Sequence, residues 1–432
     1  MLISNKMEIR SEITPLKQVL THRPGNEHQF VSPSHIKEMI VKHGEYIENP
    51  EFILFDDITD HHKIGKEHDE LTSILNTWTE NNCIDINKLL SAIFQDLKLR
   101  KLVFDECLQI DFNLYGFTPK LNLEFINHLT SEQFVEMLIE GEWNGEKIFN
   151  MPIPNLMFTR DIGVVFGNSL LISNACHSAR KREQVIASHL FKNHSLFNNL
   201  NIIDFKRIRD DLSIEGGDVM VFNENIVLIG ISERTPKHSI EKLIPYIFKE
   251  GFTSIIGINL PKKRELMHLD TIFTRVSESE CILFPPVFYQ DNYEGEDMDI
   301  YHFTEPADYS KIKPSQKSFL ELFLSLGVEI EPIFCGGNNP LLQKREQWTD
   351  GANSFALAPG KIIGYKRNYA TINELEKHGY LVLSTEQFQK DPNKWKTTNE
   401  KFIITIEGSE LVRGRGGMRC LTMPLKRENN IG

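Results

Sequence analysis

The sequence predicts an α/β fold with a separate helical segment, and two features of its 432 residues lead to this expectation. Residues 170–185, 227–243 and 362–375 share one plan, in which a short β-branched run is followed by a polar loop with an arginine and then by helical spacing. Across residues 63–141, by contrast, glycine and proline are almost absent and apolar residues recur at helical spacing. We therefore expect strand–loop–helix units interrupted by an inserted helical subdomain.

The clearest individual elements lie near the N-terminus and in the helical segment. Leu16–Thr21 is predicted to be a strand, and a turn follows at Arg23–Asn26. Thr130 is placed to cap a helix, with Gln133 completing the cap and Gly141 ending the helix.

The strand–loop–helix units also indicate where a ligand would bind. In such α/β arrangements, ligands lie where the carboxyl ends of the strands meet the loops. Arg180 and Arg234, in the loops of the first two units, are therefore candidate ligand-binding residues.

Composition restricts the class of partner. The chain has 48 Lys and Arg against 60 Asp and Glu, a formal net charge of −12, which argues against nucleic acid or an anionic membrane surface. A negative field would instead attract a small cationic ligand. The first residues lack the pattern of a secretory signal, and the longest apolar stretches, such as 281–288, are too short to span a bilayer.

The cysteine pattern fits neither a disulfide framework nor a zinc site, because it contains no C-x-x-C pair. We therefore expect a reduced, cytoplasmic protein. Apart from Cys420, the cysteines have no motif around them and are expected to be core residues. The six cysteines are Cys83, Cys107, Cys176, Cys281, Cys335 and Cys420.

One of these cysteines stands in an unusual setting. The stretch G-R-G-G-M-R-C-L-T-M-P-L, from Gly414 to Leu425, places arginines and glycines beside Cys420. An arginine near a thiol favours the thiolate, and glycines let the backbone approach a ligand closely. A glycine-rich turn with a buried, inert cysteine would have the same sequence. The loop alone therefore leaves open whether Cys420 is a reactive thiol or an inert core residue.

Three further stretches combine polar groups with an apolar or glycine-rich frame: N-L-M-F-T-R-D (155–161), I-E-G-G-D (214–218) and M-H-L-D-T (267–271). Asp161 could instead form a surface ion pair, and E-G-G-D could be a hairpin turn. His268 and Asp270 lie two residues apart, which places them on one face if the segment is a strand.

Taken together, a cysteine, a histidine and several scattered carboxylates are typical of nucleophilic attack with acid–base help. Several acids around a thiol would raise its pKa unless a cationic substrate occupies the site. A guanidinium fits, because its N–H groups pair with carboxylates two at a time. Arg180 and Arg234 could hold a carboxylate at the other end, as in arginine.

These stretches resemble motifs of the arginine deiminase family, within the guanidino-group-modifying enzymes, in the family's order. The similar stretches are M-P-I-P-N-L-M-F-T-R-D, E-G-G-D, G-I-S-E-R-T, M-H-L-D-T-I-F-T, R-E-Q-W-T-D-G-A-N and G-R-G-G-M-R-C-L-T-M-P-L, together with L-F-D-D (54–57) and K-E-H-D (66–69) near the N-terminus. The resemblance implies a five-bladed pseudosymmetric ββαβ propeller of the pentein type. Residues 1–65 and 146–432 would form the catalytic domain, and 66–145 an inserted helical subdomain.

The resemblance also implies roles for the chemical groups. Cys420 would be the nucleophile, Asp161 and Asp270 would hold the guanidinium, and His268 and Glu215 would transfer protons. The implied reaction is hydrolysis of L-arginine to citrulline and ammonia through a covalent adduct, with no metal and no organic cofactor.

A second set of residues would bind the rest of the substrate. Arg180, Arg234 and Asn155 would bind the α-carboxylate, and Phe158 would pack on the aliphatic part. Arg415 would lie near the thiolate, where it would tune the sulfur or close over the substrate. L-arginine is the expected partner, without nucleic acid or membrane, and we expect a homo-oligomer, a dimer or higher.

Some residues differ from the family pattern, and alternative functions remain open. Ile162 stands where the family usually has proline, and Met157 replaces a common tyrosine. The acidic stretch 289–300 is interpreted as a solvated loop. The alternatives are an amidinotransferase, a deiminase of a related guanidine and a non-catalytic relative. We assign a supporting role around the site to Arg345, Trp348, Asp350 and Asn353.

Overall fold

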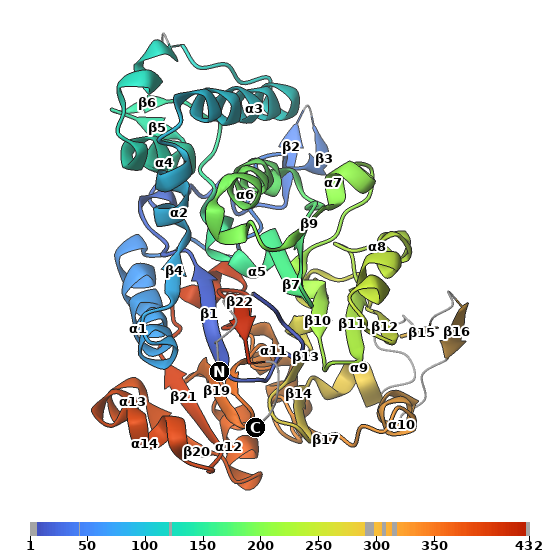
Figure 1. Ribbon diagram of the computed structural model, residues 1–432. Coiled ribbons are helices and arrows are strands. Elements are labelled where there is room, and N and C mark those ends of the chain that lie inside the picture. The colour runs from blue at the N-terminus through green and yellow to red at the C-terminus, as the bar shows by residue number, and fades with distance from the viewer. Residues whose placement is uncertain are drawn as a thin grey trace.

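The computed structural model describes residues 7–42, 44–120, 123–289, 298–304, 308–312 and 318–428. Within these residues, five sheets have three or more strands (Figure 1). In each sheet an antiparallel strand pair is extended by a parallel strand after a helical connection, as parallel pairing requires. This mixture of strands and connecting helices is the predicted α/β class.

One of these sheets joins the two ends of the chain. β1 (Leu16–Thr21) pairs antiparallel with β22 (Met423–Arg427) and parallel with β4 (Cys83–Asp85). Helix α1 (His61–Thr79), which connects β1 to β4, contacts β1. The bounds of β1 are those predicted from the sequence.

The other four sheets follow in chain order. The second contains β7 (Gly163–Phe166), β8 (Ser169–Ile172) and β9 (Asn201–Asp204), with helices α6 (Lys181–Asn193) and α7 (Phe205–Ile208). The third contains β10 (Val219–Val221), β11 (Ile226–Ile231), β12 (Ser254–Asn259), β15 (Ile300–Thr304) and β16 (Asp308–Ile312), with helix α8 (Lys237–Lys249). The fourth contains β13 (Phe273–Arg275), β14 (Glu280–Leu283) and β17 (Glu331–Phe334), with helices α9 (Pro285–Tyr289) and α10 (Ser318–Ser325). The fifth contains β18 (Phe355–Ala358), β19 (Lys361–Tyr365), β20 (Leu381–Ser384) and β21 (Phe402–Ile406), with helices α11 (Pro340–Trp348), α12 (Tyr369–Lys377), α13 (Thr385–Lys390) and α14 (Pro392–Thr397).

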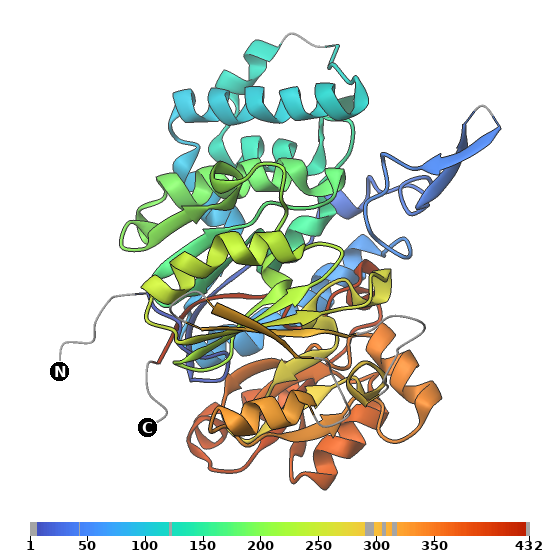
Figure 2. The same cartoon turned by 90° about the vertical axis from the view of Figure 1, so that its right-hand side faces the viewer.

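The part of the predicted helical segment from α2 onward lies at one end of the molecule, whereas α1 lies beside β1 (Figures 1 and 2). It contains α2 (Ile86–Ile93), α3 (Leu97–Tyr115), α4 (Ser131–Glu140) and the short pair β5 (Glu142–Trp143) and β6 (Glu146–Lys147). Thr130 and Gln133 form the predicted capping box of α4, and Gly141 ends it with a φ of 81°. Apolar side chains of α2 and α4 share one core with those of β7–β12.

A two-stranded hairpin that the sequence analysis did not predict projects from the body (Figure 2). Its strands are β2 (Met39–Lys42) and β3 (Glu45–Glu48), which pair only with each other in the described structure.

The structure excludes two interpretations that the sequence left open, and a third stretch falls largely outside the described residues. M-H-L-D-T is not a strand, because Leu269–Thr271 forms a 3₁₀ helix, η8. E-G-G-D is not a hairpin turn, because Gly216–Asp218 forms a 3₁₀ helix, η6. Most of the acidic stretch 289–300 lies outside the described residues. Among the helices that the structure does describe, none has both the length and the apolar character needed to cross a bilayer.

The cysteines follow the core prediction only in part. Cys107, Cys281 and Cys335 are buried, whereas Cys83 is intermediate and Cys176 is exposed. Burial raises the pKa of Cys107 to about 12, as expected for an inert core thiol.

Candidate active site

Four of the candidate residues share one place in the fold: the short segment that leads into an edge strand of a sheet. Asp161 lies in α5 (Thr159–Ile162) before β7, and Asp218 ends η6 before β10. Asp270 lies in η8 before β13, and Cys420 precedes β22. Because these edge strands begin next to the same buried region, residues far apart in sequence meet there.

Cys420 lies within this buried group, with 4% of its surface exposed. Its Sγ is 3.9 Å from Oδ2 of Asp270 and accepts a hydrogen bond at 3.2 Å from Nδ2 of Asn353. Burial, followed by the charges of Asp270, Asp161 and Asp350, raises the pKa of the Cys420 thiol well above its ordinary value. This environment therefore favours the protonated thiol at neutral pH.

The arginines beside Cys420 in the sequence do not produce a thiolate, contrary to one expectation. Arg419 directs its guanidinium to Asp270 and Glu12, and Arg415 directs its own to Asp56 and the carbonyl of Trp348. The Arg415 guanidinium also stacks 4.0 Å from the centre of the Trp348 ring. The nearby carboxylates raise the pKa of the Cys420 thiol instead, which agrees with the expectation that several acids around a thiol have this effect.

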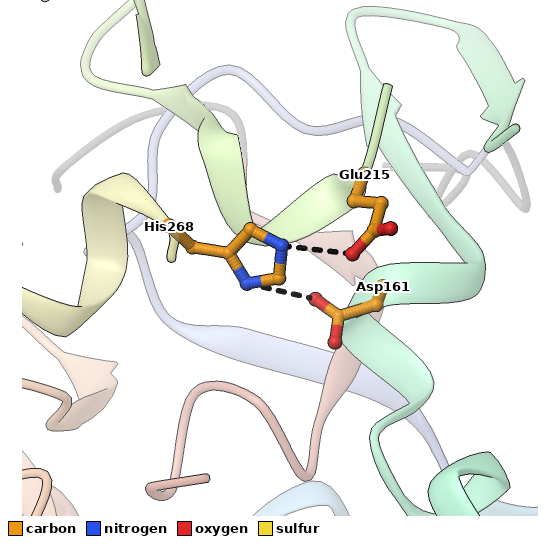
Figure 3. A group of neighbouring side chains, drawn as sticks. All are labelled: Asp161, Glu215 and His268. Carbon is orange, nitrogen blue, oxygen red and sulfur yellow. Dashed lines mark hydrogen bonds and ion pairs between the residues drawn. The ribbon is translucent and has the colours of Figure 1, made fainter. Parts of the chain in front are cut away.

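His268 lies between two carboxylates (Figure 3). Its Nε2 is 2.9 Å from Oε2 of Glu215, and its Nδ1 is 3.7 Å from Oδ1 of Asp161. Although burial opposes it, the charges of Asp161, Glu215 and Asp218 raise the pKa of His268 to about 10. The imidazolium is thus held as a proton donor at neutral pH.

Glycine lets His268 occupy this position. A Cβ on Gly217 would lie 2.6 Å from Nδ1 of His268, and a Cβ on Gly216 would lie 2.0 Å from the carbonyl oxygen of Arg160. The two glycines of E-G-G-D are therefore explained by close approach of the imidazole and of a neighbouring backbone.

Glu215 is held by positive and polar partners. Its Oε1 accepts a hydrogen bond from the backbone N–H of Cys176 at 3.0 Å, and its Oε2 lies 3.7 Å from Nη1 of Arg234. Burial opposes ionisation, but Arg234 and His268 hold the pKa of Glu215 below its ordinary value. Asp218 differs, because burial raises its pKa to about 6.

Asp161 and Asp270 each have one oxygen bound to an arginine and one oxygen without a hydrogen-bond partner in the described structure. Oδ2 of Asp161 accepts from Arg180 at 2.5 Å, and Oδ2 of Asp270 accepts from Arg419 at 2.7 Å. Each Oδ1 is buried without a hydrogen bond from any described residue. Such atoms are suited to N–H donors of a ligand, because a buried acceptor left unpaired is costly.

The residues predicted to bind the substrate carboxylate are buried but engaged with the protein. Besides Asp161, Arg180 donates from Nε to Glu183 at 2.9 Å. Arg234 donates from Nε to Glu233 at 2.8 Å, and Asn155 donates from Nδ2 to the carbonyl of Ile53 at 2.8 Å.

Phe158 and Arg415 are brought to the site differently. Arg180 donates from Nη2 to the Phe158 carbonyl at 3.3 Å, and a Cβ on Gly416 would lie 2.2 Å from the Phe158 ring. Phe158 therefore lies between the Arg180 region and the Cys420 loop. Arg415, in the left-handed region with a φ of 65°, lies instead against Trp348 and Asp56.

Two charged residues of the site region were missed by the sequence analysis. Arg419 donates to both oxygens of Glu12, at 3.2 and 3.1 Å, besides binding Asp270. Although burial opposes it, Arg419 and Arg160 lower the pKa of Glu12 to about 2. Arg419 adjoins Cys420 in the quoted motif, which was a usable signal, whereas nothing around Glu12 distinguishes it from other acids.

Asp161, Glu215 and His268 are also residues of the kind that bind metals, with ligand atoms within 4.8 Å of one another. Both ring nitrogens of His268 face carboxylates, and Arg180 and Arg234 lie beside the same acids. This arrangement fits a protonated imidazolium held by ion pairs, and the two arginine charges oppose a bound cation.

Several curated proteins align with this chain over almost its full length. Curated arginine deiminases of Borreliella afzelii and Mycoplasma capricolum are 33% and 32% identical to it, over 98% and 99% of this chain and 98% of each relative. The arginine deiminase of Listeria monocytogenes is 30% identical over 99% of this chain and 100% of its own length.

A solved structure and a family model extend the comparison. An amidinotransferase from Microseira wollei, SxtG, has a TM-score of 0.53 at 12% identity and covers 99% of this chain and 98% of its own, a likeness of fold alone. The family model described as arginine deiminase matches residues 135–427. This chain belongs to the arginine deiminase family.

Proposed function

We propose that this protein hydrolyses the guanidinium group of L-arginine to L-citrulline and ammonia through a covalent adduct on Cys420. Family membership supports the reaction. The observation that carries the mechanism is the buried group in which Sγ of Cys420 lies 3.9 Å from Asp270, in a site that also holds Asp161, Glu215 and His268.

In this proposal, the guanidinium lies between Asp161 and Asp270. Their Oδ1 atoms, which lack a hydrogen bond from any described residue, would accept its N–H groups. A cation between the two carboxylates offsets the negative charge around Cys420 and favours the thiolate, whose proton leaves to solvent. Substrate binding would therefore activate the nucleophile.

The sulfur then attacks the guanidinium carbon, and a C–S bond forms. His268 gives its proton to one nitrogen as the C–N bond breaks, so that ammonia leaves and a thiouronium remains. The neutral imidazole next takes one proton from water as the oxygen adds to the carbon. The C–S bond then breaks to return the thiolate, and the added hydroxyl loses its remaining proton to solvent as the C=O of citrulline forms. Glu215, hydrogen-bonded to His268 at 2.9 Å, would hold the imidazole in position for both transfers.

Arg180, Arg234 and Asn155 would bind the α-carboxylate, and Phe158 would pack on the methylene groups. Arg180 binds Asp161 in the structure, and Asp161 is also the residue proposed to hold the substrate guanidinium. When the substrate binds, Arg180 would thus release Asp161 and bind the substrate carboxylate. The substrate guanidinium would then bind Asp161 where Arg180 had been. Arg415 would close over the bound substrate.

The finer features of the fold and setting belong to the same proposal. The five sheets, each entered near the site, support a five-bladed pseudosymmetric ββαβ propeller. Residues 1–65 and 146–432 would form the catalytic domain and 66–145 the helical insertion, with β4 attached to the β1 sheet. We further propose a cytoplasmic homo-oligomer that needs no metal or organic cofactor.

The direct test is incubation of purified protein with L-arginine. Citrulline and ammonia are expected in equal amounts, without any added amine. An absolute need for a second amine would establish an amidinotransferase instead, and faster turnover of another guanidine would establish a related deiminase.

A further inference from the structure

Asn353 occupies in the fifth sheet the place that acids and the cysteine occupy in the others. It lies just before β18, an edge strand of that sheet, as Asp161, Asp270 and Cys420 lie before the edge strands β7, β13 and β22. The sequence analysis gave Asn353 only a supporting role. Asn353 is uncharged, whereas the residues in the equivalent places of the other sheets include the acids Asp161 and Asp270.

The side chain of Asn353 is buried and uses its full hydrogen-bonding capacity. Its Nδ2 donates to Sγ of Cys420 at 3.2 Å and to the carbonyl oxygen of Asp270 at 3.0 Å. Its Oδ1 accepts from the backbone N–H groups of Arg419 at 2.9 Å and Cys420 at 3.3 Å. Two backbone donors require an oxygen facing them, so the network fixes the amide orientation and directs Nδ2 at the sulfur.

The backbone around Asn353 reinforces this contact. The N–H of Met418 donates to the carbonyl of Asn353 at 3.1 Å. A Cβ on Gly417 would lie 2.6 Å from Oδ1 and from Cβ of Asn353, so only glycine lets the loop approach this closely. The nucleophile and its amide neighbour are therefore fixed relative to each other.

We propose that Asn353 is a further catalytic residue, which donates an N–H to the Cys420 sulfur whenever that sulfur is anionic. This inference rests on the proposed function, in which the sulfur is a thiolate before attack and again as the product leaves. A hydrogen bond to the charged form favours that form. The donor would thus help both steps.

An uncharged donor suits this site better than a cationic one. An arginine or lysine here would pair with Asp161 or Asp270 and compete with the substrate guanidinium for them. The amide stabilises the sulfur without occupying the acids. The charged or titratable groups whose fields act on the Cys420 sulfur are Asp161, Asp270, Asp350, Arg160 and Tyr365.

Two variants separate donation to sulfur from support of the loop. Asn353→Asp keeps an oxygen for the two backbone N–H groups and replaces the donor by a second oxygen. Asn353→Ala removes both functions and is uncharged, which covers the case in which a buried charge prevents folding. Asn368→Asp is the matched control, because Asn368 is a buried amide that donates to the carbonyl of Thr349 at 2.9 Å.

The first readout needs no substrate. The rate of Cys420 alkylation by iodoacetamide is measured against pH by mass spectrometry of the digested protein, with the exposed Cys176 as the reference thiol. In both Asn353 variants, the midpoint for Cys420 is expected to rise by about one pH unit, a roughly tenfold slower alkylation at a fixed lower pH. Asn368→Asp should keep the wild-type profile.

The second readout is turnover of arginine, with thermal melting to verify folding. In both Asn353 variants kcat is expected to fall about 100-fold, with KM changed little, because the contact acts on the sulfur. A wild-type alkylation profile in either folded variant would overturn the proposal, even if kcat falls, since Asn353 would then only support the loop. If the wild-type protein fails to turn over arginine, the proposed function fails, while the alkylation profiles still test the contact with sulfur.

Discussion

Arg419 donates a hydrogen bond from Nη1 to Oδ2 of Asp270 at 2.7 Å, although the two residues are 149 positions apart in the sequence. The same Asp270 oxygen lies 3.9 Å from the Cys420 sulfur. Arg419 also binds Glu12, so a fully buried cation joins Glu12 to Asp270, the acid beside Cys420. Arg419 therefore offsets part of the negative charge of the site and fixes Asp270.

Replacement of Arg419 by methionine should destabilise the fold, because it leaves Glu12 and Asp270 buried without their partner. Loss of one member of a buried ion pair costs about 3–5 kcal/mol in unfolding free energy. Urea unfolding measures this change. Arg209→Met, which removes an exposed pair with Asp211, is the control and should leave stability unchanged. Equal stability of the Arg419 variant and wild type would show that the buried pairs do not support the fold.

Cys420→Ala should abolish citrulline formation and leave the melting temperature close to that of the wild type. Its side chain is small and carries the proposed nucleophile, so its loss removes the chemistry and little packing. Cys335→Ala, which changes a buried cysteine elsewhere, is the matched control and should retain turnover. Ordinary activity in the Cys420 variant would refute covalent catalysis.

Agmatine, which lacks the α-carboxylate, should be a poor substrate. If Arg180 and Arg234 each make a charge-assisted contact of about 1.5–3 kcal/mol with that carboxylate, kcat/KM should be at least about 100-fold lower than for arginine. The two substrates are compared in one citrulline or carbamoylputrescine assay. Comparable values would assign the two arginines another role.

Gly217→Ala should reduce kcat strongly while the protein stays folded. The added Cβ would lie 2.6 Å from Nδ1 of His268 and would displace the imidazole. Gly257→Ala, in β12, is the control, because its nearest neighbours would lie at 3.4 Å, an ordinary contact distance. A Gly217 variant with wild-type kcat would show that the position of His268 does not limit the reaction.

His268 should also make stability depend on pH. Its pKa rises from 6.5 to about 10 on folding, so its charged form stabilises the folded state fully below about pH 6.5. That contribution is lost as the pH rises toward 10. The difference in unfolding free energy between wild type and His268→Asn should therefore shrink from pH 6 to pH 10.

A difference that stays flat from pH 6 to pH 10 would contradict this interpretation, because it would mean that the charge of His268 does not stabilise the fold.

Local patterns predict β1 and the capped helix α4 correctly, because strand alternation and capping depend on neighbours in the sequence. They do not settle the segment of His268 and Asp270, where a strand was only a condition and the structure has a short 3₁₀ helix. The contact of Arg419 with Glu12 spans 407 positions and leaves no periodic signal. The roles proposed for the candidate site residues come from motif resemblance, since no local rule brings together segments from separate sheets.

The pairing of β1 with β22 makes the site depend on a contact between segments that are distant in the sequence. Arg419, next to Cys420, binds Glu12 across 407 positions. An intermediate in which β22 has not yet paired with β1, however much of the rest has folded, therefore lacks an assembled site. Recovery of citrulline formation after dilution from denaturant would accordingly report closure of the whole chain.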